Sequence, residues 1–541
     1  MSKRNILTRS KKIQAERLAL DNCWDEAQTL YASVCKIDPT DAEAWVKLGA
    51  IQFRLGRYEE AESCARRALL LAPNLSFARQ TLSTILQHQG KLDEASGILQ
   101  GTLAQQPNSP EALVNLARLR EEQGHLNEAF NLYHQALDLQ PESLYVLAKR
   151  GELLEKEGRL AEAEATVARG LGQMPSSPIL NLAAARLDRR AGRHAEAAAR
   201  LEAVLDQPMH QDLGMEIHLL LGQLHDRLGN INKVLPHLLE GKRRMAMVAD
   251  PDRRRSIRFL ARCDNARGWL TDRLANSHHI APSSQDETPI FLVGFPRSGT
   301  TLLEQVLDSH PRLQTLDEKP MAEVMERAFL DMTRGGSNAL ADLSGKQIAS
   351  LRSIYWEEAA RHVMRQPGTL LVDKLPLNII RVPLLWRVFP EARFILAIRH
   401  PCDVTLSCLM QNFGINDAMV GFVSLERTAE IYTRVMGAWN ECTERLPLHW
   451  QRIRYEDLIT DFESEICTLL GFLGVGWNNK VLEHTQHAQQ RGIINTPSYH
   501  QVTRPIYQHA KHRWGRYEKE FAPVIEVLQP FIEQFDYSDF K

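Results

Sequence analysis

The chain has 541 residues, of which 44% are hydrophobic and 24% are charged, and its formal net charge at pH 7 is −2. This length and apolar content suffice for two or three packed domains and exclude a chain that is disordered throughout. The near-neutral charge excludes a globally basic nucleic-acid-binding protein, so any anion site must be local.

Targeting and redox signals are weak throughout the sequence. The basic N-terminus is followed by no apolar stretch of signal-peptide length, and no uncharged run is long enough to cross a bilayer. The eight cysteines are scattered without paired spacing, which favours reduced thiols over a zinc site or a disulfide framework. We therefore expect a cytoplasmic protein without a membrane span.

A repeat of 34 residues runs through the first 200 residues. Each unit has a turn residue, an alanine five positions later and, in most units, a closing proline. The turn residues are Asn22, Gly56, Gly90, Gly124, Gly158 and Gly192, the alanines are Ala27, Ala61, Ala95, Ala129, Ala163 and Ala197, and the prolines are Pro39, Pro73, Pro107, Pro141 and Pro175. Glycine permits a tight turn, alanine lets two helices approach, and proline ends the second helix. The pattern predicts six or seven helical hairpins and resembles tetratricopeptide repeats.

We assign this all-α solenoid to residues 12–242 and a helical connector with a linker to residues 243–287. Solenoids of this kind are concave and bind extended peptides or other proteins. A spacer or a dimerisation surface is the alternative role.

The pattern changes from Pro289 onward, where short β-prone runs alternate with helical ones. Strands are expected at residues 290–293, 369–372, 394–398 and 450–455, which predicts an α/β domain with a mostly parallel sheet over residues 288–541. Ligands in such sheets bind at the carboxyl ends of the strands. The polar groups at those ends are Arg297, Ser298, Asp373, Lys374, Arg399, Tyr455, Glu456 and Asp457.

A phosphate-loop pattern follows the first of these strands. Gly294 to Thr301 has the spacing G-x-x-x-x-G-x-[ST], but Thr300 stands where nucleotide-binding loops have a lysine. Backbone N–H groups between Gly294 and Gly299 can still surround an anion at the N-terminus of the next helix. The positive charge has moved to Arg297, whose guanidinium binds oxygens in pairs. We therefore expect a ligand with one 5′-phosphate, not a triphosphate.

The motif Pro-Arg-Ser-Gly-Thr-Thr, together with Arg399 and Ser407, resembles the sulfotransferase fold. Further segments resemble the tyrosylprotein sulfotransferases, at residues 307–311, 373–376, 389–394, 455–458 and 501–505. The likeness covers about residues 288 to 520, and the whole chain resembles bacterial proteins that join tetratricopeptide repeats to such a domain. It implies a P-loop-like fold with 3′-phosphoadenosine 5′-phosphosulfate (PAPS) as sulfuryl donor and no required metal.

The resemblance also implies residue roles. Lys374 corresponds to the lysine that contacts the transferring sulfuryl group, and Glu318 lies where the family has its catalytic base. Implied donor contacts are Arg297, Ser298, Gly299, Thr300 and Thr301 for the 5′-phosphosulfate, Arg399 and Ser407 for the 3′-phosphate, and Tyr455, Ser498 and Arg513 elsewhere. Two positions depart from the family. Gln411 replaces an arginine near the 3′-phosphate, and Pro320, next to Lys319, replaces an arginine that reads acidic peptides.

These residue types suit sulfuryl transfer on chemical grounds as well. The reaction depends mostly on positioning and charge stabilisation, which Arg297 and Lys374 can supply. Glu318 can take the proton of an acceptor hydroxyl, and tyrosine, with a pKa of about 10, is the best single acceptor. A glycan, a lipid or a small phenol stays open as the acceptor, and no oligomeric state is indicated.

Two other functions compete with this interpretation. Asp373 ends a strand that resembles a Walker B strand, which leaves a nucleotide-dependent kinase possible. A scaffold whose transferase domain has no turnover is the second alternative. The C-terminal histidines, at positions 484, 487, 500, 509 and 512, lack metal-ligand spacing, and Arg504, Lys511, Arg513 and Arg516 are expected to close over the cofactor.

Overall fold

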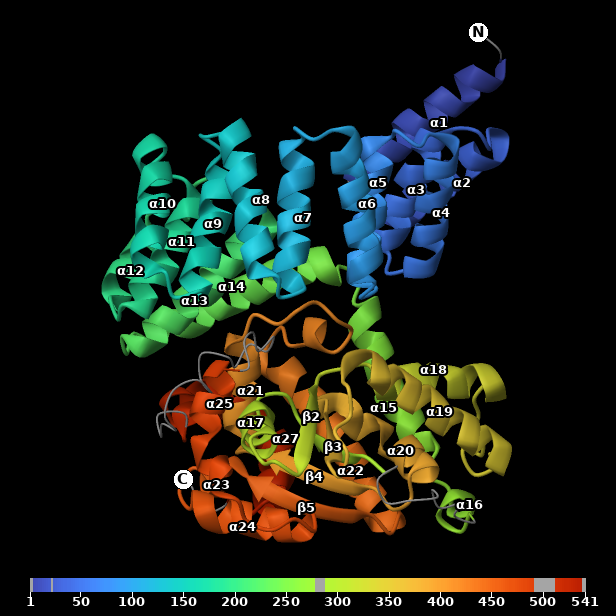
Figure 1. The fold of residues 1–541 in the computed structure, drawn as a ribbon, viewed down its shortest axis with the longest axis vertical. Helices are drawn as coiled ribbons and strands as arrows, with labels where there is room; N and C mark the ends of the chain where they lie inside the picture. Colours follow the sequence, from blue (N-terminus) through green and yellow to red (C-terminus); the bar gives the residue numbers. More distant parts are fainter. Residues whose placement is uncertain (1–2, 21–22, 278–287, 491–510, 538–541) are drawn as a thin grey trace. The chain divides into compact units, whose positions relative to one another are not determined.

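The computed structural model describes residues 3–20, 23–277, 288–490 and 511–537 (Figure 1). The chain divides into two compact units, residues 1–209 and 210–541. None of the helices in the described ranges combines the length and apolar character needed to cross a bilayer.

The first unit is an all-helical solenoid of antiparallel hairpins (Figure 1). Its helices are α1 (Lys3–Leu20), α2 (Trp24–Ile37), α3 (Ala42–Arg54), α4 (Tyr58–Leu71), α5 (Ser76–His88), α6 (Leu92–Gln105), α7 (Pro110–Glu122), α8 (Leu126–Leu139), α9 (Leu144–Lys156), α10 (Leu160–Gln173), α11 (Pro178–Arg190) and α12 (His194–Glu202). The five turn glycines from Gly56 to Gly192 have φ between 73° and 85°, a range that favours glycine. All six repeat alanines are fully buried. Both observations confirm the predicted hairpins.

The second unit contains a five-stranded parallel sheet with the order β2-β3-β1-β4-β5. The strands are β1 (Ile290–Gly294), β2 (Leu313–Asp317), β3 (Leu370–Lys374), β4 (Arg393–Ile398) and β5 (His449–Arg454). This confirms the predicted α/β fold and its four strands. The edge strand β2 was not predicted, because Gln314, Thr315 and Asp317 leave only two leucines to mark it.

Alternate side chains of the sheet enter two separate cores. Leu292 and Val372 pack against α17 (Thr300–Asp308) and α24 (Phe462–Phe472). Phe291 and Leu371 pack on the other face, against helices α19 (Gly345–His362), α20 (Val382–Val388), α21 (Pro401–Met410) and α22 (Leu425–Arg445). The helix after β1 thus covers one face and the helix after β4 covers the other. In open α/β sheets, this change of side opens a ligand crevice at the carboxyl ends of the two strands.

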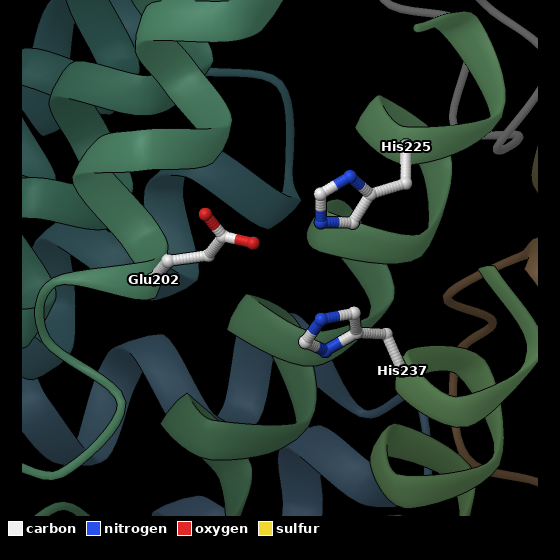
Figure 2. Close-up of side chains that lie close together, drawn as sticks. All are labelled: Glu202, His225 and His237. Atoms are coloured by element: carbon white, nitrogen blue, oxygen red, sulfur yellow. The ribbon is translucent and has the colours of Figure 1, made fainter. Parts of the chain in front are cut away.

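The second unit begins earlier than the boundary we expected at residue 242. Helices α13 (Gln211–Arg227) and α14 (Ile231–Ala249) form one more hairpin, in which His225 stacks on His237 with ring centroids 5.4 Å apart (Figure 2). Their side chains Leu219 and Leu238 join the same hydrophobic core as Phe291 of the sheet. This shared core explains why the hairpin belongs to the second unit, although its sequence continues the repeat.

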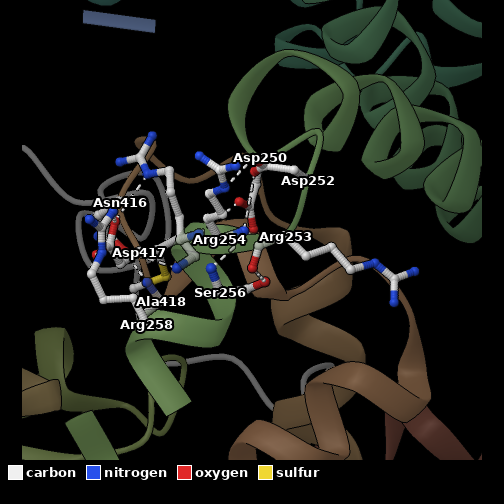
Figure 3. Close-up of polar contacts among 11 residues, drawn as sticks. Asp250, Asp252, Arg253, Arg254, Ser256, Arg258, Asn416, Asp417 and Ala418 are labelled. Carbon is white, nitrogen blue, oxygen red and sulfur yellow. Dashed lines mark hydrogen bonds and ion pairs between the residues drawn. The ribbon is translucent and has the colours of Figure 1, made fainter. Parts of the chain in front are cut away.

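The expected connector is also part of this unit up to residue 277. Asp250 accepts hydrogen bonds from the backbone N–H groups of Arg255 and Ser256, at 2.8 and 3.0 Å, at the start of α15 (Arg254–Gly268). Asp417, in the loop before α22, pairs with Arg255 and Arg258 at 3.0 and 2.7 Å (Figure 3). The linker residues 278–287 lie outside the described residues.

The remaining elements of the second unit are short helices and one long C-terminal helix. They are α16 (Asp272–Ala275), α18 (Met321–Thr333), η2 (Pro376–Arg381), η3 (Met419–Gly421), α23 (Tyr455–Leu458), η4 (Asn479–Glu483), α25 (His484–Gln490), η6 (Arg513–Tyr517) and α27 (Glu518–Gln534).

Gly294 lets β1 and β4 approach at the point where the phosphate loop begins. A Cβ on Gly294 would lie 2.4 Å from the backbone oxygen of Ala397. We therefore expect Gly294→Ala to lower the free energy of unfolding by about 1–3 kcal/mol, as other overpacked sites do. Gly437→Ala in α22 is the control, because no atom lies within 4 Å of its added Cβ. This control should gain about 0.5–1 kcal/mol. Urea denaturation measures both, and equal stabilities of the two variants would contradict the close approach.

Candidate active site

The loop between β1 and α17 has the curled backbone of an anion-binding loop. Arg297 and Gly299 both have positive φ, of 75° and 89°. Ser298, Thr300 and Thr301 are at most 6% exposed. A Cβ on Gly299 would lie 2.8 Å from the ring of Tyr455, so the glycine lets that ring pack against the loop. A non-glycine residue such as Arg297 rarely adopts positive φ, and such strain concentrates at functional sites.

Four of the predicted donor-binding side chains meet near the carboxyl ends of β1, β4 and β5. The Nε of Arg297 donates to the hydroxyl of Ser407, on α21, at 3.0 Å. The guanidinium of Arg399, directly after β4, donates to the carbonyl oxygen of Arg297 at 3.5 Å. It also lies over the ring of Tyr455, 5.1 Å from the centroid. The site thus gathers two arginines, one hydroxyl and one aromatic ring beside the loop.

Lys374 and Glu318 lie together at the ends of neighbouring strands. Lys374 is opposite Asp317 in the register of β3 and β2 and opposite Leu292 in β1. Its ammonium donates to Glu318 Oε1 at 3.1 Å and also pairs with Asp317. The backbone N–H of Glu318, where φ is 51°, donates to the carbonyl oxygen of Lys374 at 2.8 Å. Backbone and side chain together therefore fix Glu318 relative to Lys374.

The two partners of this ion pair differ in exposure. The Lys374 side chain is 0% exposed, whereas the Glu318 side chain is 43% exposed. Burial alone would lower the pKa of Lys374, but the nearby carboxylates of Glu318, Asp317 and Glu304 outweigh it and raise that pKa above its usual value. The site therefore combines a buried ammonium whose charged form the nearby carboxylates favour with a carboxylate that solvent can reach.

Asp373 points to the other side of the sheet. Its carboxylate accepts a hydrogen bond from the hydroxyl of Tyr355, on α19, at 2.8 Å. Its strand neighbour Leu371 packs on that same face, while Lys374 faces α17. The carboxylate that suggested a Walker B strand is thus buried away from the helix that follows the phosphate loop.

Two arginines that we expected to close over the cofactor, Arg513 and Arg516, instead form ion pairs with the hairpin α13–α14. Arg513 pairs with Asp226, on α13, at 2.5 Å, and Arg516 pairs with the same carboxylate at 2.8 Å. The backbone carbonyl oxygen of Gln411 accepts a hydrogen bond from the ammonium of Lys242 at 2.8 Å. Ser498 and Arg504 lie outside the described residues.

Two aspartates contact the site and were not predicted. Asp317 pairs with the ammonium of Lys374, as Glu318 does. The sequence did not indicate this contact, because β2, the strand that Asp317 ends, was not predicted. Asp403, on α21, accepts the backbone N–H groups of His512 and Trp514 at 2.9 Å each and lies 3.8 Å from Arg399. No sequence spacing links residue 403 to residue 512.

Comparisons with known proteins find similarity in both halves of the chain. Residues 289–479 match the sulfotransferase family, residues 120–187 and 182–231 match tetratricopeptide repeats, and residues 34–144 match the repeat domain of cytochrome c-type biogenesis protein H. An uncharacterized protein of Aquifex aeolicus is 29% identical over 278 residues, which cover 49% of this chain and 35% of that protein. Protein-tyrosine sulfotransferase 1 of Danio rerio is 26% identical over 270 residues, which cover 47% of this chain and 73% of that enzyme.

A solved tetratricopeptide repeat protein from Parabacteroides merdae is 18% identical, with a TM-score of 0.37 over 43% of this chain and 91% of its own. The fold is that of a helical repeat protein with a C-terminal α/β domain built on a parallel sheet. The chain is thus similar to tetratricopeptide repeats over residues 120–231 and to the sulfotransferase family over residues 289–479. It spans about a third of the Aquifex aeolicus relative.

The buried carboxyl of Asp373 predicts a pH-dependent stability. Burial raises its pKa to about 7. The folded protein therefore holds a proton that the unfolded chain has released between about pH 4 and pH 7. The free energy of unfolding should fall as pH rises through this window, by at most about 1.4 kcal/mol per pH unit, and become level above it.

Asp373→Asn should remove this slope, because the amide does not titrate. The measurement is the difference in free energy of unfolding between wild type and variant from pH 4.5 to 8, by urea denaturation followed by tryptophan fluorescence. Asp331→Asn, at an exposed position of α18, is the control and should follow wild type. If the free energy of unfolding of wild type minus that of Asp373→Asn stays constant over this pH range, Asp373 does not titrate there.

Proposed function

We propose that this sulfotransferase moves a sulfuryl group from PAPS to an acceptor hydroxyl, with a protein tyrosine as the preferred acceptor. The observation that carries the proposal is the contact between Glu318 and Lys374 beside the phosphate loop. It joins a carboxylate that can accept a proton to a cation that can stabilise the departing charge. Both residues lie at the carboxyl ends of parallel strands, which is where α/β enzymes bind their ligands.

The donor set fits the two anionic ends of PAPS. The backbone of Gly299, Thr300 and Thr301 at the start of α17, with Arg297 and Ser298, would hold the 5′-phosphosulfate. Arg399 and Ser407 would hold the 3′-phosphate, and Tyr455 would line the site beside Gly299. A loop without a lysine suits one phosphate better than a triphosphate. Ser498 stays a prediction from the resemblance.

The chemistry needs no metal ion in this scheme. PAPS, when bound, supplies a sulfuryl group on a 5′-phosphate leaving group. Lys374 stays protonated because its pKa is raised, and its ammonium offsets the negative charge that grows on the leaving oxygen. Arg297 acts on the same oxygens from the loop. Loss of one such contact typically lowers the rate roughly 10²- to 10³-fold.

Glu318 would act as the general base. Its side chain is exposed enough to meet an acceptor, and its contact with Lys374 holds the carboxylate at the end of the strand, where it could accept the hydroxyl proton. Tyrosine suits this base because its pKa of about 10 makes the proton easier to remove than that of an aliphatic alcohol. The relative from Danio rerio is named as a protein-tyrosine sulfotransferase, which favours the same acceptor.

The tetratricopeptide array would recruit the acceptor protein or another partner, since such repeats suggest protein interaction. Pro320 replaces the arginine that would read acidic peptides, so the preference for acidic sequence around the tyrosine should be weaker here. The Asp373 carboxylate, buried against Tyr355, argues against the kinase alternative. A scaffold without turnover has no specific observation in its favour.

Binding of 3′,5′-adenosine bisphosphate tests the donor site. At about 100 times its Kd, this product should stabilise the protein by roughly 2.7 kcal/mol, visible as a higher Tm. Arg399→Ala should lose the shift, because it removes a cation proposed for the 3′-phosphate. Arg393→Ala is the control: it lies at the opposite end of β4, where its side chain donates to the carbonyl oxygen of Leu473 at 3.0 Å, and it should keep the shift. A shift with ATP and Mg²⁺ instead would favour a kinase.

Glu318→Gln tests the base separately from binding. We expect sulfuryl transfer to a tyrosine peptide to fall roughly 10²- to 10⁴-fold, because the amide cannot take the proton. The Kd for the bisphosphate should stay near wild type. Glu323→Gln, a nearby carboxylate of α18 that pairs with Arg381, is the control and should keep its activity. Transfer assays with ³⁵S-labelled PAPS give the rates, and wild-type turnover by Glu318→Gln would reject Glu318 as the base.

A further inference from the structure

The hairpin α13–α14 holds the C-terminal end of α21. The side-chain amide of Gln223 donates to the carbonyl oxygen of Met410 at 2.8 Å, and the ammonium of Lys242 donates to that of Gln411 at 2.8 Å. Carbonyl groups at a helix end lack partners within the helix and need donors from elsewhere. The hairpin supplies two of them. Ser407 lies on the same helix, one turn before Met410.

The same hairpin also holds η6. Asp226 is 3% exposed, and its carboxylate accepts from Arg513, Arg516 and the hydroxyl of Tyr517 at 2.5, 2.8 and 2.5 Å. Its backbone oxygen accepts a further bond from Arg516 at 3.2 Å. One buried carboxylate thus binds three side-chain donors of the C-terminal segment.

A second set of bonds connects η6 back to α21. The backbone N–H groups of His512 and Trp514 donate to Asp403, which lies 3.8 Å from the guanidinium of Arg399. The hairpin therefore reaches α21 by two routes, directly at Met410 and Gln411 and indirectly through η6. Both routes end at residues next to the proposed 3′-phosphate site.

We propose that α13–α14, a hairpin of the repeat type, is a positioning element of the donor site, with Asp226 and Lys242 as the residues that hold Arg399 and Ser407 in place. This inference rests on the proposed function, because it assigns those two residues to the donor. The hairpin orients them and does not touch the donor itself. The repeat-type segment and the transferase domain are in this respect one functional unit.

The buried charge of Lys242 indicates that this residue positions α21 and does not merely fill space in the core. Its side chain is 0% exposed, and a buried ammonium costs free energy that an apolar residue of similar volume would not. Burial lowers its pKa to about 8. Hydrophobic contacts of Leu219 and Leu238 already bury the hairpin in the core. What the ammonium adds is a bond of fixed direction to the last turn of α21.

The test compares Lys242→Met and Asp226→Asn in the full-length protein. Methionine keeps the volume and removes the donor, and asparagine keeps the shape and removes the charge. We expect the Kd for 3′,5′-adenosine bisphosphate and the KM for PAPS to rise roughly 2- to 30-fold in each variant, with kcat nearly unchanged. Glu240→Gln is the control: this residue pairs with Arg243 and Arg244 on α14 itself, and the variant should keep wild-type values.

A second measurement does not depend on the cofactor. Hydrogen exchange of the backbone amides of residues 401–411 and 512–517 should become faster in both variants and stay unchanged in Glu240→Gln. Unchanged exchange there would overturn the proposal, even if the wild type fails to bind the bisphosphate. That failure would reject the proposed function alone. A fall in kcat with unchanged Kd and KM would also overturn it, because the hairpin would then act elsewhere than on the donor site.

Discussion

The buried ion pair of Lys374 is the constraint on which the rest of the C-terminal domain depends. Carboxylates close to a buried ammonium offset the free-energy cost of removing its charge from water, and here Asp317 and Glu318 provide them from the end of the neighbouring strand. The pair therefore requires β2 and β3 to lie side by side and in register. The edge strand that the sequence marks least clearly is also the one that carries the proposed base. Its pairing with β3 fixes Glu318 where an isolated loop could not.

Sheet topology explains why the other site residues converge. Since β1 lies between β3 and β4, the loop after β1 faces Lys374 on one side and Arg399 on the other. Successive side chains of β3 point to opposite faces of the sheet. The ammonium of Lys374 therefore points toward α17, and the neighbouring carboxyl of Asp373 points toward Tyr355. A shift of one residue in the register of β3 would exchange them and place a carboxylate beside the phosphate loop. The strand register therefore determines that a cation, and not a carboxylate, lies on the α17 face of β3 beside the loop.

Sequence reasoning recovered the features that repeat or that follow a local pattern. The 34-residue period identified the hairpins, and apolar runs identified four of the five strands. It missed β2, because three polar residues in a five-residue edge strand give no clear alternation. It placed the domain boundary at residue 242, because α13–α14 has the repeat pattern while its buried side chains join the other core. It could not foresee Asp226 or Asp403, whose partners lie more than a hundred residues away in sequence.

The hairpin α13–α14 shows how a helical repeat can become part of the core of an α/β domain. A repeat unit presents an apolar face that needs a neighbour, and at the end of an array that face must be covered by polar residues or by another domain. In this chain the hairpin core is continuous with that of the α/β domain, and Lys242 and Asp226 add bonds of fixed direction to the apolar contact. Apolar contact alone would permit small sliding movements of α21. The polar bonds restrict them, and they do so at the helix that carries Ser407.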